Sequence, residues 1–224
     1  SIAVSSYLWI VLLAALTPSN AESPLKFESL SLNQGISHNM VYCVIQDRSG
    51  IVWLGSMYGL IRYDGHGYTT FTNDPNDSLS ISNNDVVSIF EDSTGDLWIG
   101  TWGGGLNRFA RDNSTFVRFL SDSSRIAIGG NTFWATAEVV NGGQRELWFA
   151  GAGEGLFRTR LSSETGARQF EKVELSFDKP VRVIQTLQSS SDSLLRIGTN
   201  VGIFEILNGA QIRHLPVLKG EIAE

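Results

Sequence analysis

The sequence predicts an all-β protein in which a unit of four short strands is repeated along the chain. Two stretches carry the same pattern of Asp, Gly, Trp and Arg: DRSGIVWLGSMYGLIRYDG (Asp47–Gly65) and DSTGDLWIGTWGGGLNRFA (Asp92–Ala110). β-Rich segments flank both copies, and no amphipathic helical window separates them. Four antiparallel strands in a repeat of roughly 45 to 50 residues are typical of the blades of a β-propeller.

Two weaker copies continue the series. LWFAGAGEGLF (residues 147–157) is the third copy, and its Trp148 follows Trp98 by 50 residues, whereas 45 separate Trp98 from Trp53. LLRIGTNVGIFEI (residues 194–206) is a degenerate fourth copy with Arg196 in the tryptophan position. The sequence therefore predicts about four blades.

Each unit supplies its remaining strands from either side of the motif. The strand before it is expected in VYCVIQ, VVSIFE, WATAEVV and VRVIQTL, and the outer strand after it in YTTFTN, FVRFLS, FEKVEL and IRHLPV. LKFESLSLNQG (residues 25–35) precedes the first unit as an outer strand would. We expect residues 25–35 to close the ring against a last blade beyond this segment, which makes the chain the N-terminal part of a longer protein.

The glycines of the third copy raise the question of a phosphate loop. Gly151, Gly153 and Gly155 follow GxGxG spacing rather than GxGxxG, no Lys-Ser or Lys-Thr pair follows, and the next residues alternate like a strand. The same position reads SMYG, TWGGG and TNVG in the other copies. A hairpin turn that needs positive φ explains all four copies, and a nucleotide site does not.

The other repeated residues have structural interpretations. We expect the tryptophans to act as wedges between blades, the aspartates to cap turns through their own backbone, and the motif glycines to bend the backbone. These residues are Trp53, Trp98, Trp148, Asp47, Asp92, Gly55 and Gly100. A strand-edge salt bridge or a stacking contact explains the repeated arginines, Arg62, Arg108 and Arg158.

The chain opens on an apolar segment. YLWIVLLAALT (residues 7–17) is uncharged and is followed by Pro18 and a small-residue cleavage pattern ahead of Glu22. This segment predicts a secretory signal peptide over residues 1–21 whose start is truncated, and a propeller over residues 22–224. A truncated membrane anchor is the alternative. Both interpretations predict that the rest of the chain is exported.

Net charge and cysteine content argue against nucleic-acid binding, anionic-lipid binding and thiol chemistry. There are 17 basic and 23 acidic residues, a net charge of −6, and no run of Lys and Arg, which argues against binding nucleic acid or anionic lipid. Cys43 is the single cysteine and has apolar neighbours. It therefore predicts a buried, inert thiol.

No catalytic centre can be assembled from the sequence. HExxH, GxSxG and CxxC are absent, and the three histidines show no metal-ligand spacing: His38, His66 and His214. We expect no catalytic residues, no metal and no cofactor.

One face of the propeller offers a candidate binding site. The turns between second and third strands and the starts of the first strands should share it, and amides beside aromatic rings suit a polar ligand such as a saccharide. The candidate residues are Asn39, Tyr58, Asn84, Trp102, Asn131, Glu154 and Asn200. The alternative is that the asparagines are ordinary turn residues.

The pattern G-x-x-W-[LI]-G-[ST]-x-x-G-L-x-R-[FY], preceded by SHNMV or SNNDV, resembles the two-component regulator propeller repeat. The resemblance covers about residues 36–206 and weakens after the second copy. It implies the periplasmic part of a bacterial sensor, a seven-bladed propeller followed by an immunoglobulin-like domain, a transmembrane helix and a histidine kinase or diguanylate cyclase.

Three functions remain open at this stage. The first is an extracytoplasmic sensory region that binds a small molecule or a periplasmic protein, is tethered to the membrane through a later segment, and is compatible with a homodimer. The second is a secreted propeller enzyme, such as a lyase or a quinone-dependent dehydrogenase. The third is a structural scaffold. Fold alone cannot choose among them.

Overall fold

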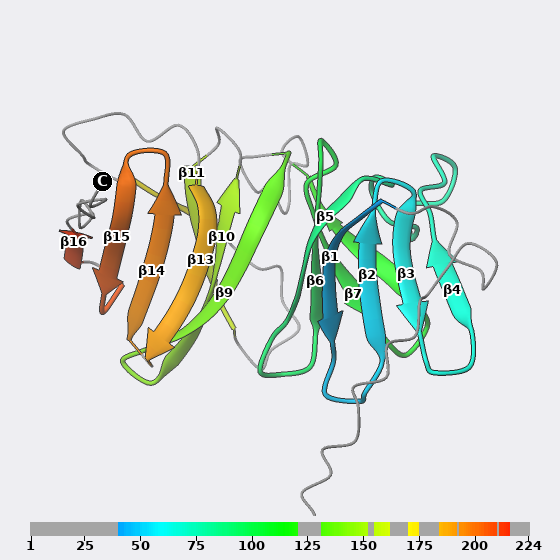
Figure 1. The fold of residues 1–224 in the computed structure, drawn as a ribbon, viewed down its shortest axis with the longest axis horizontal. Coiled ribbons are helices and arrows are strands. Elements are labelled where there is room, and N and C mark those ends of the chain that lie inside the picture. Colours follow the sequence, from blue (N-terminus) through cyan, green and yellow to red (C-terminus); the bar gives the residue numbers. More distant parts are fainter. Residues whose placement is uncertain are drawn as a thin grey trace, which may run out of the picture. The chain divides into compact units, whose positions relative to one another are not determined.

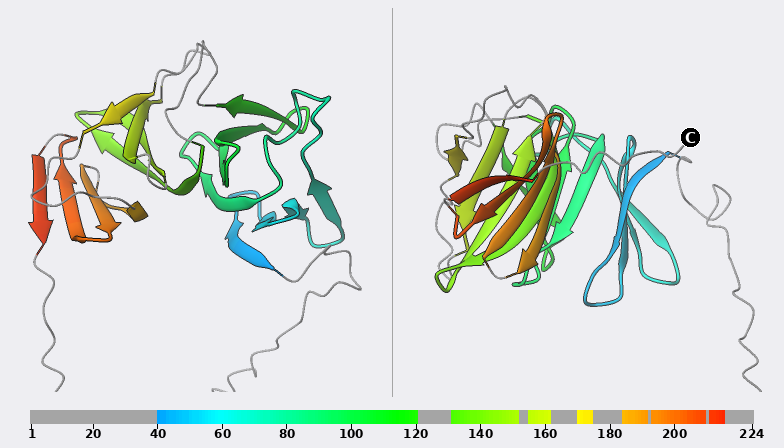
Figure 2. Two further views of the ribbon diagram at one scale, coloured as in Figure 1. Left: turned by 90° about the horizontal axis from the view of Figure 1, so that it is seen from above. Right: turned by 60° about the vertical axis from the view of Figure 1, so that its left-hand side comes forward.

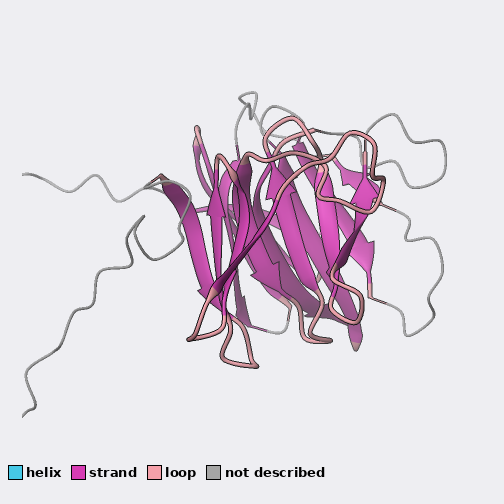
Figure 3. Ribbon diagram, turned by 90° about the vertical axis from the view of Figure 1, so that its right-hand side faces the viewer, coloured by secondary structure: helices cyan, strands magenta, loops and turns pink. Residues whose placement is uncertain are grey.

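The computed structural model describes residues 40–120, 131–151, 155–161, 170–174, 184–191, 193–209 and 211–215. These residues all lie within a single compact unit of the chain. Every regular element described is a β-strand (Figure 3), and the sixteen strands form four sheets of four strands. The all-β fold built from blades is confirmed. The predicted signal peptide, the predicted closing strand over residues 25–35 and Asn39 lie outside the described residues.

Each sheet is one blade, and the strands within it follow chain order (Figure 1). Blade 1 contains β1 (Val41–Gln46), β2 (Val52–Ser56), β3 (Gly59–Tyr63) and β4 (Tyr68–Phe71). Blade 2 contains β5 (Val86–Glu91), β6 (Leu97–Thr101), β7 (Leu106–Ala110) and β8 (Thr115–Phe119). Blade 3 contains β9 (Phe133–Asn141), β10 (Gln144–Gly151), β11 (Gly155–Arg160) and β12 (Glu171–Val173). Blade 4 contains β13 (Ile184–Ser191), β14 (Leu194–Thr199), β15 (Gly202–Leu207) and β16 (Gln211–Leu215).

Neighbouring strands pair antiparallel in every blade, and consecutive blades pack through their first strands. Strand β5 contacts β1 and β2, β9 contacts β5 and β6, and β13 contacts β9 and β10 (Figure 2). Blade 2 packs against blade 1 on one face and blade 3 on the other, and its second strand β6 is therefore buried at every position.

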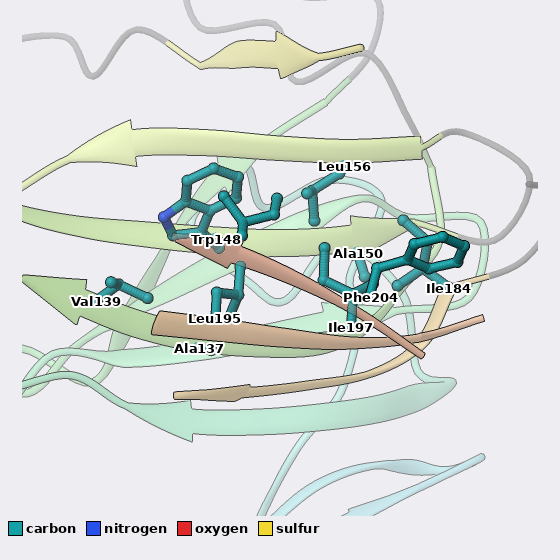
Figure 4. Close-up of a cluster of buried hydrophobic side chains, with 10 residues drawn as sticks. Ala137, Val139, Trp148, Ala150, Leu156, Ile184, Leu195, Ile197 and Phe204 are labelled. Atoms are coloured by element: carbon teal, nitrogen blue, oxygen red, sulfur yellow. The ribbon is translucent and has the colours of Figure 1, made fainter. Parts of the chain in front are cut away.

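The repeated tryptophans fill the interfaces between blades. Trp53, Trp98 and Trp148 are each at most 1% exposed. Trp53 packs against blade 2, with its ring 5.1 Å from that of Phe109, and Trp98 packs against blade 3, with its ring 5.3 Å from that of Phe149. Trp148 joins the cluster between blades 3 and 4 (Figure 4). The three indoles therefore occupy equivalent places.

The first two of these indoles are each hydrogen-bonded to an aspartate carboxylate. The Oδ2 atoms of Asp47 and Asp92 each accept a hydrogen bond from the tryptophan six residues later, at 2.8 Å. Their Oδ1 atoms accept backbone N–H bonds two and four residues on, at 2.9 and 3.0 Å. The sequence indicates the bond within the turn but not the bond to the tryptophan, because the latter depends on how the hairpin brings the indole back over the turn.

Blade 3 lacks this carboxylate. Its first hairpin is closed by Gly142 and Gly143 at φ of 56° and 80°, where blades 1 and 2 have a longer turn that begins with Asp. Trp148 Nε1 is buried and has no hydrogen-bond partner among the residues that the structure describes, and the Arg158 guanidinium lies 5.6 Å from the centre of the Trp148 ring. Arg158 also pairs with Glu171 at 2.9 Å, and Arg108 pairs with Asp96 at 3.0 Å.

Gly55 and Gly100 do not bend the backbone, contrary to the expectation from the sequence. Both lie inside strands, β2 and β6, where the next blade comes closest. A Cβ atom on Gly100 would lie 2.1 Å from the carbonyl oxygen of Phe133, and one on Gly55 would lie 2.8 Å from that of Val86. These glycines therefore allow neighbouring sheets to approach closely. At this contact the Ser88 hydroxyl donates a hydrogen bond to the Phe133 carbonyl oxygen at 2.8 Å.

The glycine that recurs in the second hairpin of each blade has positive φ. Gly59, Gly105, Gly155 and Gly202 have φ between 76° and 133°. Chain bending at the hairpin accounts for the repeated glycines, as the sequence predicts.

A second repeated link joins neighbouring blades at the edge that carries the first-hairpin turns. Glu91 pairs with Leu97 and Glu138 pairs with Leu147, so the two glutamates hold the same register position in blades 2 and 3. Each accepts a backbone N–H from the first turn of the preceding blade, Arg48 at 2.9 Å and Ser93 at 2.6 Å. Sequence analysis missed this link because the partners lie 43 and 45 residues apart.

Candidate functional site

The second-hairpin turns and the starts of the first strands meet at one edge of the blades, which we call the turn face. In blade 2, the backbone N–H of Trp102 donates to the Asp85 carbonyl at 2.8 Å. The N–H of Gly103 donates to Thr132 Oγ1 at 2.9 Å, and that of Gly105 donates to the Asn131 carbonyl at 2.8 Å. The turn between β6 and β7 is thus fixed between the starts of β5 and β9.

The structure places most of the predicted binding residues at this face. Tyr58 and Trp102 lie on second-hairpin turns and are 39% and 52% exposed. Asn131 and Asn200 are also exposed. Asn39 and Glu154 lie outside the described residues.

Asn84 is engaged in the fold. It is half-buried, and its Oδ1 accepts the backbone N–H of Asn73 at 2.6 Å. Asn73 in turn donates its side-chain amide to the Ile81 carbonyl at 2.7 Å. The amide of Asn84 therefore fixes the connection from β4 to β5, which is the turn role that the sequence left as the alternative.

A β-bulge recurs near the start of every first strand. In each blade two residues of the first strand face one residue of the second, and the extra residues are Tyr42, Val87, Trp134 and Gln185. A bulge redirects the side chain of the extra residue. In blade 3 that side chain is Trp134, whose ring centre lies 4.8 Å from that of Trp102 at an interplanar angle of 84°. We call this arrangement the tryptophan corner.

Two residues that contact Trp102, Asp85 through its backbone and Trp134 through its ring, each carry a buried side-chain atom without a hydrogen-bond partner in the described part of the chain. These atoms are Asp85 Oδ1 and Trp134 Nε1. Asp85 precedes β5, and its carbonyl oxygen holds the backbone of Trp102. Sequence analysis missed both residues. The order Trp-Ala-Thr-Ala-Glu predicts a strand, and only the bulge turns Trp134 toward its partner.

Burial and hydrogen bonding shift the pKa values of two groups outside the tryptophan corner, Cys43 and Asp47. Burial raises the pKa of Cys43 to about 11, so its thiol stays protonated and unreactive at neutral pH. Burial alone would also raise the pKa of Asp47, but hydrogen bonds from Trp53, Arg111 and the Ile51 backbone hold it below its ordinary value. Among the described residues, no three His, Cys, Asp or Glu side chains are grouped as metal ligands.

The family comparison matches the repeated motif. The model described as two component regulator propeller matches residues 35–58 and 80–103, which are the first two copies. The chain contains two-component regulator propeller repeats. A curated relative, Histidine kinase P4 from Formosa agariphila, is 38% identical over 55 residues, which is 25% of this chain and 4% of that protein.

Solved structures support the same fold. The extracellular domain of the hybrid two component system BT3049 from B. thetaiotaomicron is 21% identical with a TM-score of 0.69, over 84% of this chain and 26% of that chain. The extracellular domain of the one component system BT4673 from the same organism is 21% identical with a TM-score of 0.63, over 83% and 27%. This chain thus spans about a quarter of these structures and a small part of the curated relative. No described segment forms a helix long and apolar enough to cross a membrane.

Proposed function

We propose that this chain is part of the extracellular sensory region of a membrane-bound signalling protein, and that its turn face receives the ligand. The single observation that carries the ligand-binding part is Trp102, a large aromatic side chain that is half-exposed on a turn whose backbone N–H groups donate three hydrogen bonds to neighbouring segments. Aromatic side chains held rigidly at a surface are typical of binding sites.

The signalling part is supported by relatives. The repeats match a family model for two-component regulators, the curated relative is a histidine kinase, and the similar structures are extracellular domains of signalling systems. Such a region has to bind a ligand or a protein outside the cell and to transmit the change. The proposal includes a periplasmic location, a tether to the membrane, and a kinase or cyclase domain that produces the output.

We propose no catalysis for this segment. Hydrolytic or redox chemistry would require a positioned acid, base, nucleophile or metal. Among the buried carboxylates of the described structure, Asp47 and Asp92 accept indole and backbone N–H groups, and Glu146 pairs with Arg158 and Arg160. The chemistry available at the turn face is hydrogen bonding and stacking, which serves binding.

The test uses the full-length natural protein in membrane vesicles. Its output, autophosphorylation or cyclic dinucleotide formation, is measured against a panel of small polar molecules that includes saccharides. We expect at least one compound to change the output and Trp102→Ala to remove that change. The control is Thr70→Ala, an exposed position on the outer strand β4. Output that responds equally in the Trp102→Ala variant would contradict the role of the turn face.

A further inference from the structure

We infer that the tryptophan corner of Trp102 and Trp134, with Asp85 beside it, binds a small organic ammonium ion. The inference rests on the proposed function and names the class of ligand that its turn face receives.

The corner has the geometry for a compact cation. Two indole rings meet at 84° with their centres 4.8 Å apart, so a ligand in the angle touches the face of one ring and the side of the other. The face of an indole ring is electron-rich and attracts a cation within about 6 Å of the ring centre. Trp102 is 52% exposed, so a ligand can reach it.

The local charge also favours a cation. The three segments that form this part of the turn face, residues 82–87, 101–107 and 131–137, contain no Lys or Arg and one acidic residue, Asp85. Within the described part of the chain its buried Oδ1 atom has no hydrogen-bond partner, which is unfavourable for a carboxylate. An ammonium group beside it would compensate the charge, whereas an anionic ligand would be repelled.

The unpaired indole N–H restricts the class of ligand further. Trp134 Nε1 is a buried donor without a partner among the described residues, so a ligand that displaces this ring slightly outward would satisfy it with an acceptor oxygen near the cationic group. A neutral polyol could also bond both free atoms, but it would leave the charge of Asp85 uncompensated. The combination therefore favours an amino alcohol or a similar ammonium compound.

The test is calorimetric titration of the full-length natural protein in detergent with three probes. Choline carries the cation and a hydroxyl group, tetramethylammonium carries the cation alone, and 3,3-dimethyl-1-butanol is the neutral isostere of choline. We expect choline to bind most tightly and the neutral isostere at least about tenfold more weakly. Trp102→Ala and Asp85→Asn should each weaken choline binding by about 5- to 30-fold.

The control variant is Leu79→Ala, because Leu79 is 54% exposed and its backbone is bonded to the outer strand β8. It should bind choline as the natural protein does, and circular dichroism should show that all variants are folded. Equal binding of choline and its neutral isostere, no binding of any ammonium probe, or choline binding unchanged in folded Trp102→Ala would overturn the inference. If another compound changes the signalling output through Trp102, only the ligand class is wrong; if no compound does, the proposed function fails too.

Discussion

The tryptophans of blades 2 and 3 fill equivalent interfaces, yet only one of the two indoles has a hydrogen-bonded carboxylate. Trp98 donates to Asp92 at 2.8 Å, whereas Trp148 Nε1 has no partner in the described structure and the Trp148 ring lies against the Arg158 guanidinium. Both side chains are at most 1% exposed. The comparison shows that apolar packing is the constant part of the repeat and that the polar link depends on the first hairpin.

The largest effect should come from removing the wedge itself. Trp98→Ala should lower the free energy of unfolding by about 3 to 5 kcal/mol, because it opens a large cavity in the packed cluster between blades 2 and 3. Urea unfolding followed by circular dichroism measures the change. A loss below 1 kcal/mol would show that Trp98 is not a wedge.

The pair Trp98→Phe and Trp148→Phe isolates the hydrogen bond from the packing. Both variants lose similar volume, but only Trp98→Phe leaves a buried carboxylate oxygen of Asp92 unpaired. We expect Trp98→Phe to cost about 1 to 3 kcal/mol more than Trp148→Phe. Equal losses would mean that the Asp92–Trp98 bond contributes nothing to stability.

Removal of the carboxylate should have an effect second only to that of Trp98→Ala. Asp92→Ala leaves the N–H groups of Thr94, Asp96 and Trp98 without their acceptor, which should cost about 3 kcal/mol of unfolding free energy. The control is Asp96→Ala, because Asp96 forms a half-exposed pair with Arg108 that should contribute less than about 1 kcal/mol. The same urea experiment compares the two, and a larger loss at Asp96 would contradict this ranking.

A smaller effect should follow from filling the close contact between blades 2 and 3. Gly100→Ala forces a methyl group against the Phe133 carbonyl and should cost about 1 to 3 kcal/mol. Blade 3 already has Ala150, fully buried, at this position of the motif. The reverse change there, Ala150→Gly, is the matched variant and should cost about 1 kcal/mol. A thermal melt unchanged by Gly100→Ala would show that the sheets can separate without penalty.

The smallest effect concerns pH. The pKa of Asp47 is below its ordinary value of 3.8 in the folded chain, so the unfolded chain binds this proton more tightly. Its contribution to stability is complete above about pH 4 and is lost as the pH falls through the folded pKa. Urea midpoints between pH 6 and pH 2 should therefore fall less steeply in Asp47→Asn than in the natural chain. If the urea midpoints of the two proteins fall in parallel with pH, Asp47 is not the source of the acid sensitivity.

Much of the fold could be predicted because the signals for the strands and turns of each blade lie in short, repeated stretches of the sequence. Short β-rich apolar segments predict the strands, and Gly59 and Gly105 predict the hairpin, since both signals depend on near neighbours along the chain. The candidate site could be predicted only in part. Tyr58 and Trp102 follow from turn position, whereas Trp134 faces Trp102 because a bulge redirects it, and no local pattern marks a bulge.

The sequence by itself determined the strands, their order and the spacing of the buried indoles, because hydrophobic periodicity and turn chemistry act over a few residues. Only the tertiary structure decided that Gly100 admits a neighbouring sheet, that Glu138 accepts an N–H from the preceding blade, and that Trp134 meets Trp102. These contacts join residues about 30 to 45 positions apart, and their geometry exists only after the blades have packed together.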